Sequence, residues 1–94
     1  MFRHIAIHLC GKILKKINML VSEILKYIDN SSKPIIFDVG CFDGRDSLEF
    51  IKLLSNSKVY SFEADKNVWS LFEAIVANYE SLNNVSLGDR LKLI

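Results

Sequence analysis

The stretch that decides the fold is PIIFDVGCFDG, residues 34–44. Apart from Asp38, residues 35–39 are apolar and mostly β-branched or aromatic, as in a central strand of a parallel sheet that is covered on both faces. Gly40 and Gly44 follow in the next turn, and glycine lets a ligand approach the backbone because it has no Cβ. Ligands of open α/β sheets bind beyond the carboxyl ends of the strands, so this turn has the position of a ligand site.

Two acidic residues come at the ends of two expected strands. Asp38 interrupts the first strand, and a carboxylate in an apolar strand usually has a specific partner. Glu63 closes the second strand, where an acidic side chain can accept hydrogen bonds from both hydroxyls of a ribose. We therefore predict a cofactor site made of Asp38, Gly40, Gly44 and Glu63, and leave its catalytic residues open.

The turn also indicates which adenosine ligand fits. A dinucleotide site uses the pattern G-x-G-x-x-G so that the backbone can approach a pyrophosphate, but Phe42 takes the place of the middle glycine. The carboxylate of Asp38 would oppose a phosphate and favour a sulfonium. Gly44 is followed by Arg45 and Asp46 and not by Lys-Ser/Thr, which excludes a Walker-type phosphate loop. S-adenosylmethionine is the predicted cofactor.

The rest of the chain continues the alternation of strands and helices. Apolar spacing predicts a helix over residues 48–54, a strand over 58–63 and a helix over 66–80, with Asp65 as N-cap and with Trp69 and Phe72 facing the core. Residues 85–87 are expected to begin a third strand, and residues 91–94 to form a short strand or a frayed end. A strand, a helix and a strand in this order form a right-handed βαβ unit.

The N-terminal part predicts a different element. Apolar residues recur every three or four positions from Lys12 to Ile28, which predicts an amphipathic helix, either packed on the following domain or binding a membrane surface or partner. Turn-forming residues 29–34 end it, because Pro34 disfavours a helical residue before it. We expect an amphipathic helical segment, residues 1–33, and a Rossmann-like domain, residues 34–94, that form a partial three-layer α/β sandwich with a mostly parallel sheet.

Several polar residues have simple structural interpretations. Asp43 and Asp46 flank the start of a helix, where carboxylates cap free N–H groups. Cys41 has no histidine near it in the sequence to act as a base, so we interpret it as a small core residue. His4 and His8 would share a face of a helix, and we interpret them as a surface or capping pair and not as metal ligands.

Composition excludes several function classes. Half of the 94 residues are apolar and 24% are charged, which fits one compact domain. The net charge of +1 and the absence of a long basic block give no support for nucleic-acid binding. Two cysteines without metal-ligand spacing predict no metal site and favour a reducing, cytoplasmic location. Charged residues and histidines interrupt the N-terminal apolar stretch before it could span a membrane.

Three segments together resemble the opening of the FkbM-type methyltransferases: residues 36–44, 47–50 and 59–65. The resemblance implies that the DVG-xxxG turn, with Asp38, Gly40 and Gly44, wraps the methionine part of S-adenosylmethionine. It also implies that Glu63, in the FE-x-D segment, holds the ribose. The expected activity is O-methylation of a hydroxyl on a sugar or another small molecule, with that molecule or a glycan as the partner.

The sequence departs from the family pattern at Cys41-Phe42, where family members often have Ala-Asn, and after Asn84, where the approach to the third strand is shortened. The adenine-side and acceptor-side residues have no matching positions. We therefore expect an N-terminal fragment of the domain, inactive alone, whose first strand keeps an unpaired edge that favours self-association. A non-catalytic remnant or interaction module, and a dinucleotide-dependent oxidoreductase fragment, remain as alternatives.

Overall fold

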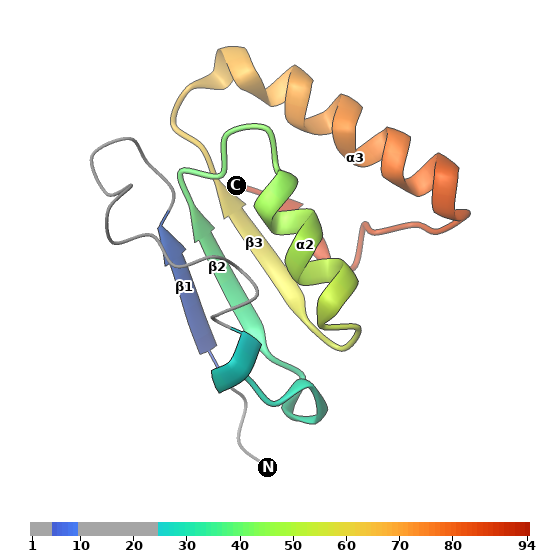
Figure 1. Cartoon of the computed structure of the whole chain (residues 1–94). Coiled ribbons are helices and arrows are strands. Elements are labelled where there is room, and N and C mark those ends of the chain that lie inside the picture. The colour runs from blue at the N-terminus through green and yellow to red at the C-terminus, as the bar shows by residue number, and fades with distance from the viewer. Residues whose placement is uncertain (1–4, 10–24) are drawn as a thin grey trace.

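The computed structural model describes residues 5–9 and 25–94 (Figure 1). Its four strands are β1 (Ile5–Leu9), β2 (Ile35–Val39), β3 (Lys58–Phe62) and β4 (Leu91–Leu93), and its two α-helices are α2 (Arg45–Leu53) and α3 (Trp69–Asn83). Short 3₁₀ turns cover Leu25–Tyr27, Asn30–Ser32 and Lys66–Val68. The strands pair in parallel in the order β1-β2-β3-β4. The predicted α/β fold, a partial Rossmann-like unit with a parallel sheet, is confirmed.

Strand β2 is paired on both of its edges. The order β4-β3-β2 corresponds to the 3-2-1 half of a Rossmann sheet, and β1 takes the position beside β2 that the fourth Rossmann strand would occupy. Its register runs from Ile5 opposite Ile35 to Leu9 opposite Val39. The prediction of an unpaired β2 edge is therefore wrong, and self-association through that edge loses its structural basis.

His8 lies on a strand and not on a helix. His8 belongs to β1 and lies opposite Asp38 in the register, while His4 lies outside the described residues. The segment IAIHL is short enough that its alternation of apolar residues was also compatible with a helical face. The predicted i, i+4 pair is wrong because the segment is extended.

One face of the sheet carries the core. Ile36 and Val59 are fully buried toward α2, whereas Phe37, Tyr60 and Phe62 on the other face are only half-buried. The Phe37 ring lies 5.8 Å from the Tyr60 ring and 6.0 Å from the Phe62 ring. Strand β2 was expected to be covered on both faces, but among the described residues the helices cover one.

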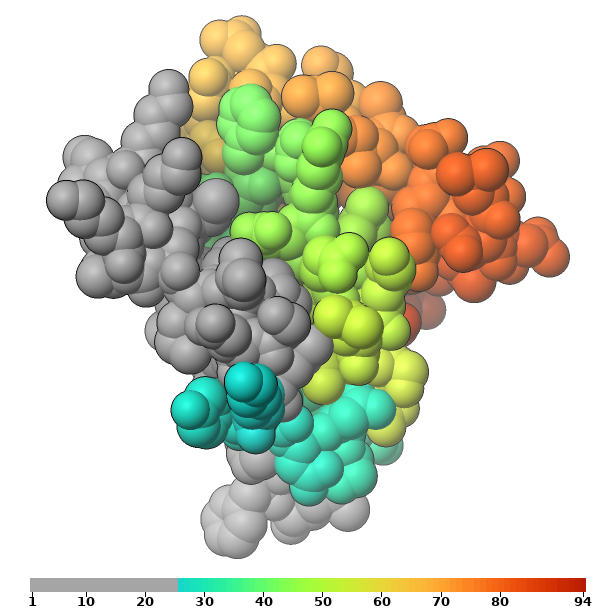
Figure 2. All heavy atoms as spheres, viewed as in Figure 1, coloured from blue at the N-terminus to red at the C-terminus, as the bar shows by residue number. Residues whose placement is uncertain are grey.

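The strand order explains this one-sided arrangement. Every connection leads to the next strand in the same direction, and right-handed crossovers in one direction place their helices on the same face. Figures 1 and 2 share one view and show α2 and α3 beside each other on this side. In the described part of the chain we therefore see two layers of the expected three.

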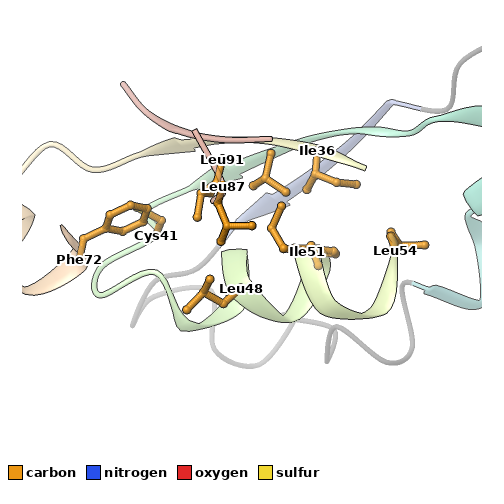
Figure 3. Close-up of a cluster of buried hydrophobic side chains, with 10 residues drawn as sticks. Ile36, Cys41, Leu48, Ile51, Leu54, Phe72, Leu87 and Leu91 are labelled. Carbon is orange, nitrogen blue, oxygen red and sulfur yellow. The ribbon is translucent and has the colours of Figure 1, made fainter. Parts of the chain in front are cut away.

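The core cluster fills the space between the sheet and the helices (Figure 3). It consists of Ile36, Cys41, Leu48, Phe50, Ile51, Leu54, Val59, Phe72, Leu87 and Leu91. Helix α2 contributes Leu48, Phe50 and Ile51, and its C-cap residue, Leu54, extends the same apolar stripe. Phe72 is 3% exposed, which confirms that it faces the core. Trp69 is only half-buried.

The third predicted strand begins later than expected. Residues 85–87 are a loop, and the strand is β4 at Leu91–Leu93, so the prediction for 85–87 is wrong and that of a short C-terminal strand is confirmed. Asn84 ends α3 in a left-handed conformation, φ 52°. The Glu80 carboxylate then accepts the Leu87 N–H at 2.8 Å, so this N–H bonds to a side chain and not to a neighbouring strand.

The predicted N-terminal helix falls largely on residues 12–24, outside the described part of the chain. Its last residues, Leu25–Tyr27, form a 3₁₀ turn, with Tyr27 77% exposed. Asp29 then caps the next turn, since its Oδ1 atom accepts the Ser31 N–H at 3.0 Å. No helix in the described ranges is long and apolar enough to cross a membrane.

Candidate functional site

The turn after β2 has three residues with positive φ. Gly40 has φ 72°, Phe42 51° and Gly44 83°. The N–H groups of Gly40 and Cys41 both donate to the carbonyl oxygen of Phe62, at 2.8 and 3.1 Å. These bonds attach the turn to the end of β3, so the two strand ends form one continuous edge.

Glu63 lies beside this turn, as the sequence predicted. Its Oε1 atom accepts the Phe42 N–H at 2.9 Å, and its Oε2 atom accepts the Asp65 N–H at 2.9 Å. The Trp69 indole N–H donates to the Glu63 carbonyl oxygen at 2.9 Å, which fixes the backbone. Each carboxylate oxygen has two lone pairs, so the side chain can accept further hydrogen bonds from a ligand hydroxyl.

Phe42 is the unusual residue of the turn. A left-handed conformation is uncommon for a bulky side chain and costs about 1 kcal/mol or more. The residue is 52% exposed, so its side chain makes only limited apolar contact. The hydrogen bond from the Phe42 N–H to the Glu63 carboxylate stabilises this backbone conformation. Strained residues of this kind are often found at functional sites.

Asp38 lies under the site and not at its open edge. It is fully buried, and its Oδ2 atom accepts the Ser47 hydroxyl at 2.5 Å. The Ser47 Oγ atom also lies 2.7 Å from the Ser61 Oγ atom, and both serines are buried. The three residues join β2, α2 and β3, so Asp38 has a structural role, and its contact with a cofactor stays a prediction.

Packing within the fold also requires a glycine at position 44. A Cβ atom added there would lie 2.5 Å from two ring atoms of Phe72, and Gly44 is buried. The glycine therefore allows α3 to pack against the start of α2. Of the four predicted cofactor residues, Gly40 and Glu63 are partly accessible, whereas Asp38 and Gly44 are buried.

The aspartates that we interpreted as capping residues lie at the starts of helices and turns. Asp43 accepts the Arg45 N–H at 3.2 Å and pairs with the Arg45 guanidinium at 3.0 Å, which confirms its capping role. Asp46 lies in the first turn of α2, where its charge suits the helix dipole. Asp65 caps the turn before α3 by accepting the Asn67 N–H at 3.0 Å, as predicted.

Cys41 is a core residue with an unreactive thiol. It is 3% exposed and packs in the core cluster. Burial raises the pKa of its thiol to about 12, and the nearby carboxylates of Asp38 and Glu63 add to the increase. The thiolate is the nucleophilic form, so this cysteine is protonated and inert at neutral pH.

Sequence reasoning missed Ser47, Ser61 and the backbone contacts of Glu63. Ser61 carried a signal, because a small hydroxyl residue within an apolar strand needs a hydrogen-bond partner. Chemically, the accessible edge offers a carboxylate beside a glycine turn, which suits ligand hydroxyl groups and a cationic centre. Comparison of the chain with protein-family models, with curated proteins and with solved structures gives no match.

Proposed function

We propose that this chain binds S-adenosylmethionine at the carboxyl edge of β2 and β3, as a methyltransferase of the FkbM type. The observation that carries the proposal is the hydrogen bond of 2.9 Å between the Phe42 N–H and the Glu63 carboxylate. It joins the glycine turn and the acidic strand end into one surface, at the edge where open α/β sheets bind ligands.

Each accessible residue has a task in this proposal. The Glu63 carboxylate accepts hydrogen bonds from the two ribose hydroxyls with lone pairs that its backbone donors leave unused. Gly40, with φ 72°, gives the methionine part access to the backbone. Asp38 lies beneath the turn, and a carboxylate there favours a sulfonium over a phosphate.

The cofactor supplies a methyl group that is activated by the positive charge on sulfur. The acceptor in our proposal is a hydroxyl of a sugar, a glycan or another small molecule. We assign no catalytic base, since the sequence gives none, and we propose cofactor binding as the property of this chain, without turnover by the chain alone. We place the protein in the cytoplasm, because Cys41 is a free, buried thiol, and we propose no nucleic-acid partner.

A specific observation favours a second candidate, a non-catalytic interaction module. Asp38 is bonded to Ser47, and Gly44 accommodates the ring of Phe72, so both residues are explained without a ligand. A dinucleotide site is less well supported, because the middle glycine of its pattern is replaced by Phe42.

Calorimetric titration of the purified chain separates these candidates. We expect S-adenosylmethionine and S-adenosylhomocysteine to bind and NAD not to bind. Binding of NAD alone would favour a dinucleotide site, and no heat with any of the three would favour the interaction module.

A matched pair of variants tests the role of Glu63. Glu63→Gln removes the charge and is expected to weaken binding at least tenfold, because hydrogen bonds to a charged acceptor contribute about 1.5–3 kcal/mol. Glu73→Gln, at an exposed position of α3, is the control and should bind like the wild type. Melting curves of both variants establish that they are folded, and unchanged affinity of a folded Glu63→Gln would contradict the assignment.

A further inference from the structure

A second site lies at the opposite edge of the sheet, where the strands begin. It is a pocket of about 210 Å³. Its lining contains Lys33, Ile35, Ser55, Asn56, Ser57, Lys58 and Arg90. Three of these residues are cationic, and no carboxylate is among them.

The strand order brings the three cations together. Lys33 precedes β2, Lys58 is the first residue of β3, and Arg90 directly precedes β4. The Lys58 N–H donates to the Pro34 carbonyl oxygen at 2.9 Å, and the Val59 N–H donates to the Arg90 carbonyl oxygen at 2.6 Å. Parallel pairing therefore holds one basic residue at the start of each of three adjacent strands.

The two turns beside the pocket are tied together. The Asn30 side chain donates to the Ser55 hydroxyl at 3.1 Å and accepts the backbone N–H of Asn56 at 3.0 Å. The side-chain amide of Asn56 donates to the backbone carbonyl oxygen of Asn30 at 3.3 Å. Figure 2 shows the teal atoms of the first turn against the yellow-green atoms of the second. The wall of the pocket is thus formed before a ligand arrives.

The charge of the pocket is not neutralised within the described residues. Arg90 donates to the carbonyl oxygens of Ile51, Leu54 and Ser57, at 3.1, 2.9 and 2.9 Å, which are neutral acceptors. These bonds also cover carbonyls at the C-terminus of α2, whose partial negative charge would otherwise repel an anion. Neither lysine forms an ion pair with a residue in the described ranges.

Lys33 adds a second unusual feature. It has φ 56°, in the left-handed region that non-glycine residues seldom adopt. Lys33 is the C-cap of the turn Asn30–Ser32, and its N–H donates to the Asn30 carbonyl oxygen at 3.2 Å, so the left-handed conformation ends this turn. The turn thereby places the exposed Lys33 among the residues that line the pocket.

We propose that this pocket binds a phosphate dianion, either as inorganic phosphate or as a phosphate monoester. The lysine ammonium groups and Arg90 supply the charge, and the hydroxyl of Ser55, which accepts a hydrogen bond from Asn30, supplies a neutral hydrogen-bond donor. The site lies at the other end of the strands from the proposed cofactor site, and it stands independently of that proposal.

The test is an NMR titration of the full chain with sodium phosphate at constant ionic strength. We expect saturable shifts of the backbone amides of residues 55–58 and of Lys33. Glycerol 3-phosphate is titrated in parallel, and tighter binding of either compound identifies the source of the phosphate. Sodium acetate tests the preference for a dianion and is expected to bind at least tenfold more weakly.

Two charge-removing variants are compared with a control. Lys33→Asn keeps a residue that tolerates positive φ, and Lys58→Gln leaves the strand intact; each is expected to weaken phosphate binding about fivefold, as loss of a partly exposed charge contact does. Lys52→Gln, on α2, should leave it unchanged. Shifts that chloride reproduces, equal binding of acetate, or unchanged affinity in both folded variants would overturn the proposal.

Discussion

The contact between Gly44 and Phe72 gives the sharpest stability prediction. In Gly44→Ala, the new Cβ atom would lie 2.5 Å from two atoms of the Phe72 ring, so the ring or the turn has to move. The φ of 83° adds a second penalty, because alanine adopts this region at a cost of about 1 kcal/mol. Overpacking of a core adds about 1–3 kcal/mol. We expect a loss of about 2–4 kcal/mol.

Urea denaturation followed by circular dichroism measures this loss. For a domain of this size, each kcal/mol corresponds to a change of about 4–8 °C in melting temperature, so the effect is also visible by heating. Gly88→Ala is the matched control, since nothing lies within 4 Å of a Cβ atom there, and its change should stay within about 0.5 kcal/mol.

A double variant separates the two causes. Phe72→Leu removes the Cε2 atom and replaces the rigid ring by a side chain whose methyl groups can rotate away, so in Gly44→Ala/Phe72→Leu the steric part is reduced while the backbone part remains. The two substitutions should therefore be non-additive by about 1 kcal/mol or more. A Gly44→Ala protein as stable as the wild type would refute this reasoning, and loss of cofactor binding in that stable protein would instead assign Gly44 to the ligand.

Further predictions concern four other positions. Phe42→Gly should stabilise the chain by about 0.5–1 kcal/mol in urea denaturation, because it removes the left-handed strain; a destabilised variant would show that the exposed ring contributes more than the strain costs. Ser47→Ala removes the hydroxyl that donates to Asp38 and should cost about 1–3 kcal/mol, so an unchanged denaturation midpoint would argue against that buried bond. Arg90→Ala should lower the free energy of unfolding by about 2–3 kcal/mol through loss of its three hydrogen bonds to carbonyl oxygens, and Arg90→Lys should restore only part of this stability. Full restoration by lysine would show that a positive charge is enough to stabilise this position. In a Cys10→Ser background, Cys41 has a pKa of about 12 in the folded state, against 9.0 when unperturbed, so the unfolded state loses its proton first. The free energy of unfolding should therefore fall as pH rises from 9.0 towards 12. Alkylation of the native thiol at pH 8, measured by mass spectrometry, should be slow.

The central part of the fold was predictable because its signals are local. The apolar run of β2, the glycine turn and the Asp65 cap each lie within a few residues, and periodicity alone placed β2, β3 and most of both helices. The placement of Glu63 beside the turn followed from parallel pairing. These elements depend on short-range chemistry that a sequence displays directly.

The remainder depends on contacts between distant residues. Nothing near Gly44 in the sequence shows that Phe72 packs on it, and nothing near Asp38 shows that Ser47 and Ser61 surround it. Strand β1 was missed because five residues give too little periodicity to separate a strand from a helix. Before the third strand, Leu87 bonds to the Glu80 carboxylate seven residues earlier and accepts the N–H groups of Arg90 and Leu91, and the sequence around residues 85–87 does not display these contacts.

The strand order β1-β2-β3-β4 also has a consequence for how the chain folds. Every strand pairs with the strand that precedes or follows it in sequence, so no pairing waits for a distant part of the chain. Loop-closure entropy therefore stays small for a parallel sheet, and folding rates rise as contacts become more local. We expect β2 and β3 to pair first around α2, and the sheet to grow outward by adding one neighbouring strand at each edge.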